Sequence, residues 1–278
     1  MDNRKLCSVL LSSCDAYSDT WAPFFILMNK YWRDCPYNVF LNTESLNYNT
    51  PDKLNFDVKA LHPKNNNCRW GERMIDVLRQ IDTPYIFLTL DDYFMKSDLN
   101  QEVFNSCLEL MEKDSSIASI QMDAARRVQE GKRVIKDDKI ILNELPKDGW
   151  KTHFIPTIWR KSVLLKWLRK HESIWGFELY GSQRARWWRY KERVLTLDAP
   201  VVYDYLWVDS CSAIVNGKWL ASKDVDSFFE NNDIQIDFSK RGRITYEEYH
   251  SRTLSYTIKK LTFFQFIERC FARVRSLW

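Results

Sequence analysis

Two adjacent carboxylates, Asp91 and Asp92, follow directly on the apolar segment 84–90, which has the composition of a buried strand. Neighbouring like charges repel, so a chain seldom places them at the end of a strand without a cation or a basic partner. Carboxylate oxygens are preferred ligands of Mg²⁺ and Mn²⁺, with substrate phosphates completing the shell. The alternative is an ordinary turn or helix start, because aspartate favours N-caps. The pair taken alone favours the turn over the metal site.

Polar residues also follow the first apolar run, 6–11, where a nucleotide-binding α/β domain holds the base and the ribose. Asp15 would accept a hydrogen bond from the nucleoside, and the ring of Tyr17 would stack on it. Taken alone, this segment favours a plain polar loop. Arg69 and Arg73 flank the start of a helical segment, and helix N-termini and arginine forks both favour phosphate. The alternative for these arginines is a solvated helix end.

A third group of candidates lies between residues 175 and 189. Trp175, Glu178, Ser182 and Arg186 are spaced by three or four residues, so they share one face if the segment is helical. A carboxylate near aromatic rings can have its pKa raised and serve as a general base. The alternative is an exposed amphipathic helix with charge pairs, which the glycines of the segment disfavour. The arginines would meet phosphates (Arg184, Arg186 and Arg189).

The four histidines, at 62, 153, 171 and 250, do not have the spacing of metal ligands. A lone histidine is more often a structural residue than a functional one. His153 is retained as a candidate on the acceptor side, because it lies near the strand that precedes the Glu178 segment.

The elements that must position these residues alternate along the chain. We expect strands at 6–11, 38–42, 57–61, 84–90, 117–122, 194–196 and 201–207, and helices at 20–32, 70–81, 100–113, 162–170 and 175–190. The nearly continuous apolar strands predict an α/β fold with a mixed, mostly parallel sheet covered by helices on both faces. Such sheets bind ligands beyond the carboxyl ends of their strands. The charged segment 123–149 is interpreted as an excursion from this core.

Composition excludes several classes of protein. The chain has 278 residues and a net charge of +4, without the long basic stripe of a nucleic-acid-binding protein. Its seven cysteines are scattered and form no C-x-x-C pair, which disfavours a zinc site or a disulfide framework and favours a reducing cytosol. No apolar run approaches the roughly 20 residues of a spanning helix. We therefore expect a cytoplasmic protein.

The C-terminal segment has a pattern of its own, and we divide the chain into a domain at 1–245 and a helical tail at 246–278. As a helix, the tail carries one apolar face, and residues 258–278 contain five basic residues against one acid. A basic, aromatic-rich amphipathic helix is typical of an anionic membrane interface. A last helix packed on the domain is equally compatible with the pattern. The apolar face would be formed by Leu261, Phe264, Ile267, Phe271, Val274 and Trp278.

Taken together, several blocks between residues 6 and 210 resemble bacterial glycosyltransferases of the GT-A type that build capsule or lipopolysaccharide. The order and spacing of the blocks carry the resemblance, and it is poor over 123–149 and the tail. The blocks are Ser13-Cys14-Asp15-x-Tyr17-x-Asp19-x-Trp21, Tyr31-Trp32, Arg69-Trp70-Gly71, Leu90-Asp91-Asp92-Tyr93-Phe94, Pro156-x-x-Trp159, and Trp175-x-x-Glu178-x-x-Gly181-Ser182.

The resemblance implies a GT-A-like fold and a nucleotide-sugar donor, with a UDP-sugar favoured. Asp91-Asp92 would be a variant of the D-x-D motif that holds Mn²⁺ or Mg²⁺, with Asp92 on the metal and Asp91 on the donor sugar or ribose. Glu178 would be the catalytic base if the enzyme inverts. The remaining donor-side residues would be Ser13, Asp15, Tyr17, Arg69 and Arg73, and those facing the acceptor or the diphosphate would be His153, Trp159, Trp175, Ser182 and Arg186.

The acceptor implied by the family and the basic tail is a lipid-linked oligosaccharide in surface polysaccharide synthesis, reached from the inner face of the cell membrane. One alternative is a metal-dependent nucleotidyltransferase or phosphohydrolase, which would usually need further Asp or His ligands. Another is a non-catalytic, membrane-peripheral protein that binds sugar nucleotides. We expect no nucleic-acid partner.

Overall fold

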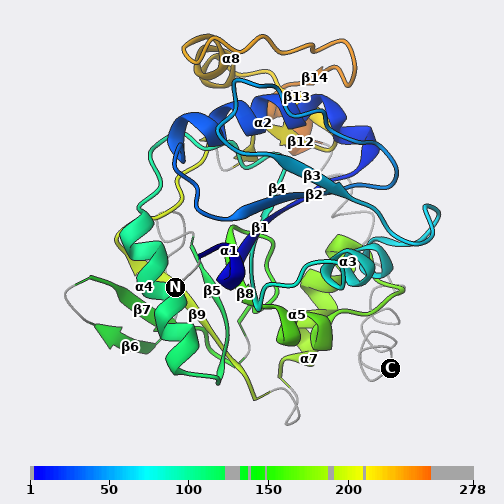
Figure 1. Cartoon of the computed structure of the whole chain (residues 1–278). Coiled ribbons are helices and arrows are strands. Elements are labelled where there is room, and N and C mark those ends of the chain that lie inside the picture. Colours follow the sequence, from blue (N-terminus) through cyan, green and yellow to red (C-terminus); the bar gives the residue numbers. More distant parts are fainter. Residues whose placement is uncertain are drawn as a thin grey trace.

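A computed structural model describes residues 3–122, 132–136, 139–147, 149–186, 191–208 and 211–251, with the backbone alone at 3 and 132–136. Within these ranges the core is a single sheet of nine strands (Figure 1). In spatial order they are β3 (Val58–Leu61), β2 (Asn38–Asn42), β1 (Cys7–Ser12), β4 (Tyr85–Leu90), β8 (Thr157–Arg160), β5 (Ile117–Gln121), β9 (Arg193–Ala199), β7 (Ile141–Glu144) and β6 (Lys132–Lys136).

The sheet is mixed and mostly parallel, as predicted. Strands β3, β2, β1 and β4 are parallel neighbours, and β9 is parallel to β5. Strand β8 runs antiparallel between β4 and β5, and β7 runs antiparallel between β9 and β6. Seven of the nine described strands therefore run in one direction. Their carboxyl ends form one edge, where the polar residues after β1 and β4 lie.

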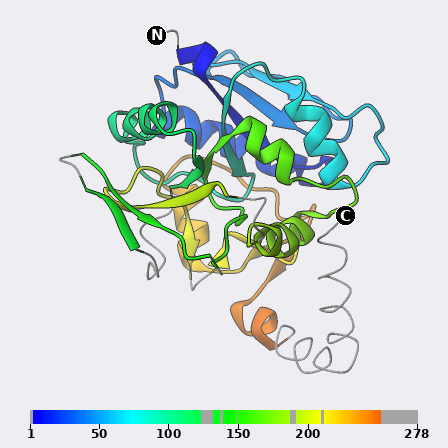
Figure 2. The same cartoon turned by 90° about the horizontal axis from the view of Figure 1, so that it is seen from below.

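Four helices cover the two faces of the sheet (Figures 1 and 2): α2 (Ser18–Tyr31), α3 (Trp70–Leu78), α4 (Gln101–Lys113) and α5 (Lys161–Trp167). Successive side chains of a strand point to opposite faces, so each strand contributes side chains to two apolar clusters, one on each face of the sheet. Val9 and Leu11 join the apolar cluster of α2 and α4, and Leu10 joins that of α3 and α5. Burial on both faces is the reason that these strands are nearly continuous apolar runs.

Short elements complete the described chain: α1 (Asn3–Leu6), the 3₁₀ turn η1 (Asp15–Tyr17), α6 (Ile174–Gly176), the π-helical turn η2 (Phe177–Gly181) and α7 (Ser182–Arg184). After the sheet come β10 (Trp207–Val208), β11 (Cys211–Ser212), β12 (Ile214–Val215), β13 (Lys218–Leu220), α8 (Lys223–Glu230) and β14 (Arg243–Ile244). This last segment lies against α2, where Lys30 Nζ and Asn232 Oδ1 are 2.6 Å apart.

Three expectations about the elements need correction. The segment 123–149 is not an excursion, because its described parts form β7 and β6 at the end of the sheet. The segment 175–190 is not one regular helix, because a π-helical turn interrupts it; its described part ends at residue 186. The strand expected at 201–207 is reduced to β10 and a single bridge between Met95 and Tyr205.

Residues 246–251, the start of the predicted helical tail, are helical, and the tail from residue 252 onward lies outside the described residues, so both of its interpretations and the boundary at 245 stay predictions. Across the described ranges, no helix combines the length and the apolar character needed to cross a bilayer. The six described cysteines are all free thiols.

Candidate active site

The carboxyl ends of β1 and β4 bring the first two predicted groups together. In the parallel register Ser12 pairs with Leu90, so Ser13 and Asp91 leave the sheet side by side. The Ser13 hydroxyl donates a hydrogen bond to Asp91 Oδ2 and accepts one from the indole of Trp21 at 2.7 Å. The serine is therefore held from both sides and fixes the orientation of the Asp91 carboxylate.

Asp91 is buried and Asp92 is half-buried, and the two form a pair of like charges with little compensation. Burial, together with the neighbouring charge of Asp92, raises the pKa of Asp91 to about 8. Burial also raises the pKa of Asp92 to about 6, although its Oδ2 accepts a hydrogen bond from Ser212 Oγ at 2.8 Å. The other oxygen, Asp92 Oδ1, is buried and has no hydrogen-bond partner within the described chain. An unpaired, buried carboxylate oxygen needs a proton or a cation.

The residues of this edge fit a divalent metal that takes part of its shell from substrate. Among the described residues, no group of three or more His, Cys, Asp and Glu side chains could hold a metal by itself. Mg²⁺ is usually bound through one or two carboxylates, with phosphates and water in the other positions. Asp91 and Asp92 match that donor set, and the unpaired Asp92 Oδ1 is the oxygen that a cation would satisfy.

A basic residue that the sequence did not single out, Arg241, lies close to the acidic pair. Its guanidinium forms a two-pronged ion pair with Asp19, donates to the carbonyl of Gly217 at 3.1 Å, and stacks over the Tyr17 ring, 4.2 Å from the ring centroid. Its charge lowers the pKa of Asp91, against the larger effect of burial. Arg241 is 222 residues from Asp19 in sequence, so only the folded chain shows the contact.

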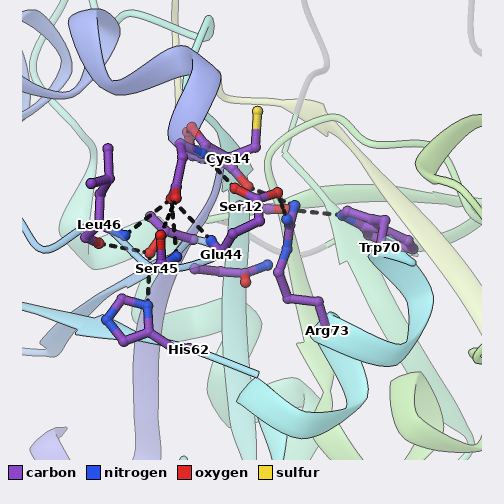
Figure 3. A network of polar contacts seen from close by, with 12 residues as sticks. Ser12, Cys14, Glu44, Ser45, Leu46, His62, Trp70 and Arg73 are labelled. Atoms are coloured by element: carbon purple, nitrogen blue, oxygen red, sulfur yellow. Dashed lines mark hydrogen bonds and ion pairs between the residues drawn. The ribbon is translucent and has the colours of Figure 1, made fainter. Parts of the chain in front are cut away.

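A network of polar contacts lies at the ends of β1 and β2 and includes Glu44, Ser45 and Leu46 (Figure 3). Asp15 Oδ1 accepts hydrogen bonds from the backbone amides of Glu44, Ser45 and Leu46 at 3.1 to 3.2 Å, and its Oδ2 accepts from Ser45 Oγ at 2.6 Å. Partial burial opposes ionisation, but these donors outweigh it and lower the pKa of Asp15. Asp15 therefore holds the turn that follows β2. A direct contact with the nucleoside stays a prediction.

Arg73 and Arg69 have different environments in the structure. Arg73 is buried, donates to the Ser13 carbonyl at 2.9 Å, and forms an ion pair with Glu44 (Figure 3). Burial lowers the pKa of Arg73, and the charges of Cys14, Asp15 and Asp91 act in the opposite direction. Arg69 is exposed and donates to the carbonyl of His171 at 3.0 Å. Sequence reasoning missed Glu44, whose role depends on the fold.

Glu178 and His153 lie together near the same edge. The antiparallel register pairs Thr157 with Leu88 of β4 and with Gln121 of β5, so the residues before Thr157 run past the carboxyl ends of those strands. Glu178 Oε1 accepts a hydrogen bond from the Phe154 amide at 2.7 Å and lies 3.7 Å from Nδ1 of His153. The predicted base and the predicted acceptor-side histidine are therefore neighbours.

An aromatic cluster joins the predicted acceptor side to the predicted donor side. The Trp70 ring lies 5.0 Å from that of Phe154 and 5.8 Å from that of Phe177, which directly precedes Glu178. The Trp70 indole also donates to Ser12 Oγ at 3.3 Å. One side chain thus contacts the end of β1, the approach to β8 and the π-helical turn, and it fixes their relative positions.

The other predicted acceptor residues separate into exposed and structural ones. Trp175 is 76% exposed and Arg186 is also exposed. Ser182 is buried, and its hydroxyl lies 2.8 Å from the Thr152 hydroxyl, so it braces the π-helical turn. Trp159 is only 1% exposed and packs on Trp167 in the core, so its expected contact with an acceptor is wrong.

The expectation that Arg184 meets phosphate is also corrected. Arg184 and Glu172 are each 1% exposed and form a two-pronged ion pair, and Arg184 Nη2 also donates to the carbonyl of Trp167 at 2.8 Å. Both terminal nitrogens of this guanidinium are therefore paired inside the protein, and its Nε is buried without a hydrogen-bond partner in the described chain. Arg189 lies outside the described residues.

No protein-family model matches the chain, and no curated protein matches its sequence. Solved structures with a similar arrangement include Staphylococcus aureus TarS 1-349 in complex with UDP, at 13% identity and a TM-score of 0.46, covering 72% of this chain and 60% of that one. The same protein with UDP-GlcNAc has 14% identity, a TM-score of 0.43, and covers 82% and 65%. A CMP:2-keto-3-deoxy-manno-octonic acid synthetase with CTP has 15% identity, a TM-score of 0.38, and covers 69% and 88%.

The chain spans 36% of the longer TarS structure and 60% of each of two TarS 1-349 structures. With every one of these TM-scores below 0.5, we base nothing about function on the likeness.

Proposed function

We propose that the chain is a metal-assisted glycosyltransferase that moves a sugar from a nucleotide-sugar donor, a UDP-sugar in the favoured case. The observation that carries the proposal is the Asp91–Asp92 pair at the carboxyl end of β4, with Asp91 buried and with the buried Oδ1 atom of Asp92 unpaired in the described chain. A like-charged pair of this kind is stable only with a proton or a cation, and a divalent ion brought by a diphosphate satisfies it.

The side chains around the pair have different roles in the proposal. Ser13 and Ser212 orient the two carboxylates through their hydroxyls. Arg241 supplies positive charge on the side of Tyr17, and Arg73 does so beside the end of β1. A bound Mn²⁺ or Mg²⁺ would neutralise the departing diphosphate as a Lewis acid. The protein's own contribution is a site in which these charges are already oriented.

Thermal unfolding in the presence of nucleotides tests the proposal. A ligand that binds only the native state stabilises it by about 2.7 kcal/mol at one hundred times its Kd. We expect UDP to raise the Tm with Mn²⁺ present and to have little effect in EDTA, and we expect release of UDP from a UDP-sugar. Release of pyrophosphate from a nucleoside triphosphate would instead indicate a nucleotidyltransferase. Metal-independent stabilisation by UDP without turnover would indicate a non-catalytic binding protein.

The acceptor and the location of the protein belong to the same proposal. We propose a lipid-linked oligosaccharide acceptor of surface polysaccharide synthesis, with residues 257–278 holding the protein on an anionic membrane surface. The support is the basic, aromatic pattern of the tail. Sedimentation with vesicles containing anionic lipid tests it. The full chain should pellet with the vesicles and the chain truncated after residue 256 should not; equal pelleting would contradict the role of the tail.

A further inference from the structure

Glu178 and His153 differ in how far each side chain reaches solvent. The Glu178 side chain is 10% exposed, and its Oε1 already accepts the Phe154 amide at 2.7 Å. Turning that oxygen toward a substrate would leave a buried backbone donor unpaired, which costs about 1–3 kcal/mol. The His153 side chain is 27% exposed. Of the two titratable groups, the histidine is the more exposed.

The backbone around Glu178 is held in place. The Thr152 hydroxyl lies 3.0 Å from the carbonyl of Phe177 and 2.9 Å from that of Glu178, so it braces the first turn of the π-helical segment. A Cβ on Gly181 would meet the Thr152 side chain at 2.9 Å, so the two segments are in close contact. A single π-helical turn within a helix is frequent at functional sites. Here it fixes the Glu178 carboxylate against the segment 152–154.

The ring of His153 lies next to this carboxylate. Its Nδ1 faces Glu178 Oε1 at 3.7 Å, so Nε2 is the ring nitrogen directed away from the glutamate. Catalytic hydrogen bonds are often long before a substrate is bound and shorten in the complex. A carboxylate that accepts from one ring nitrogen selects the tautomer in which the other nitrogen carries a lone pair. The arrangement resembles the general pattern of a base that is oriented by a third group.

An exposed aromatic ring flanks the histidine. Trp150 is 51% exposed, and its ring meets that of His153 edge to face with 6.3 Å between centroids. The Trp150 carbonyl accepts from Gln121 Nε2 at 3.4 Å, which ties it to the end of β5. An indole face with one side in solvent is a good surface for the C–H face of a sugar ring. The ligand that suits this place is therefore a sugar with a free hydroxyl.

We infer that His153, oriented by Glu178, is the group that takes the proton from the acceptor sugar hydroxyl, and that Glu178 is a positioning residue. The inference rests on the proposed function. The acceptor O–H bond breaks and its proton moves to Nε2 of neutral His153. The oxygen's electron pair forms the new bond to the anomeric carbon, and the bond from that carbon to the diphosphate breaks with its electron pair on the diphosphate. The anomeric configuration inverts.

Turnover by the full chain tests the inference, with UDP-glucose, UDP-galactose and UDP-N-acetylglucosamine as donors, Mn²⁺, and water or octyl β-glucoside as acceptor. We expect His153→Gln to lower kcat about 10²- to 10⁴-fold, the range of general-base catalysis. Glu178→Gln, which can still accept the Phe154 amide, should lower kcat about 10- to 100-fold with the donor KM unchanged. The matched control is His171→Gln, an exposed histidine whose contact with Arg69 uses its backbone carbonyl.

The outcomes separate the inference from the proposed function. If His153→Gln keeps most of the wild-type kcat while Glu178→Gln abolishes turnover, Glu178 is the base and the inference is overturned. Retention of the donor configuration in the product overturns it as well. If the wild type binds no UDP with Mn²⁺ and releases UDP from no donor, the proposed function fails and the inference fails with it. UDP-dependent stabilisation of each variant with Mn²⁺ shows that its donor side is folded.

Nitrogen NMR of the histidine rings gives a readout that needs no donor or metal. In the wild type we expect the neutral His153 ring to carry its proton on Nδ1, facing Glu178, and the fraction of this tautomer to fall in Glu178→Gln. A His153 ring protonated on Nε2 in the wild type, or unchanged in the variant, would overturn the inference. A merely structural glutamate would not set the tautomer.

Discussion

The molecule holds two buried clusters of charge that differ in how completely they are compensated. Glu172 and Arg184 pair with each other through two contacts, and Arg184 also donates to a backbone carbonyl. Asp91 and Asp92 carry the same sign, rely on two serine hydroxyls, and leave one buried oxygen without a partner. We call the first cluster complete because its opposite charges neutralise each other without a ligand, although Arg184 Nε has no hydrogen-bond partner in the described chain; the like charges of the second cluster leave it incomplete. Incomplete compensation, more than burial itself, marks a place where the protein is prepared for a ligand.

The largest effect we expect comes from the incomplete cluster and concerns activity. Asp92→Asn removes the carboxylate that would hold the cation, and Lewis-acid stabilisation is worth several kcal/mol, equivalent to about a thousandfold in kcat. Its Tm in EDTA should not fall, because a buried negative charge is lost. Turnover and thermal unfolding measured on the same preparation check both parts. If Asp92→Asn kept the turnover of the wild type, or had a lower Tm than the wild type in EDTA, the distinction between the two clusters would be wrong.

The complete cluster should show the reverse behaviour. Glu172→Gln leaves the Arg184 guanidinium buried with a weaker partner, and breaking a buried ion pair costs about 3 kcal/mol at the lower end of its usual range. The free energy of unfolding from urea titration measures this loss. The affinity for Mn²⁺ in the presence of UDP should be unchanged in the variant that remains folded. A cost below 1 kcal/mol would show that the pair contributes little.

A backbone contact anchors the complete cluster to the start of α3. The Gly71 amide donates to the Glu172 carbonyl at 2.9 Å, and a Cβ at Gly71 would lie 2.1 Å from the carbonyl oxygen of Arg169. Gly71→Ala should therefore destabilise the fold by about 2 kcal/mol, as overpacking usually does. Gly176→Ala is the matched control, because its new atom meets a serine side chain at 3.2 Å and should cost less. Equal effects on the Tm would contradict the close approach.

The incomplete cluster should also make the stability of the fold depend on pH. The folded-state pKa values of Asp91 and Asp92, about 8 and about 6, lie above the unfolded value. The pair therefore favours the fold fully below about pH 4, the unfolded pKa, and loses that contribution as the pH rises through 6 and 8. Each carboxyl contributes a slope of at most about 1.4 kcal/mol per pH unit.

Urea unfolding in EDTA between pH 5 and pH 8 measures this slope, with the double variant Asp91→Asn, Asp92→Asn as the reference for all other groups. Wild type should lose stability relative to the reference as the pH rises, and Mn²⁺ with UDP should oppose the loss. A difference that is flat across the range would show that the pair is already compensated in the metal-free protein.

The sequence predicted the strands and the polar residues that directly follow them. Apolar runs located β1, β4 and their neighbours, and the rule that ligands bind beyond strand ends placed Ser13 and Asp91 at one edge. The partners that complete the site come from distant segments: Ser212 is 120 residues from Asp92, and Arg241 is 222 residues from Asp19. No local pattern encodes such contacts. The packing of side chains around the folded edge determines them.

The residues whose surroundings were predicted wrongly also depend on contacts that no local pattern encodes. Trp159 suits either a sugar-binding surface or a core, and only its burial beside Trp167 decides between them. Arg184 resembles a phosphate ligand until Glu172, twelve residues away, is found to hold it. Helical spacing predicted that Glu178 and Ser182 share one face. In the structure, where a π-helical turn occupies this place, Glu178 lies next to His153 and the Ser182 hydroxyl contacts that of Thr152.

Binding of Mn²⁺ to the full chain, followed by electron paramagnetic resonance in the presence of UDP, tests the central claim most directly. The wild type should remove one equivalent of Mn²⁺ from the solution signal beyond what UDP alone removes. Asp92→Asn should lose that binding, and the control Asp226→Asn, an acid on α8 paired with Arg243, should keep it. Equal binding by wild type and Asp92→Asn would contradict the assignment of the cation to the carboxyl pair.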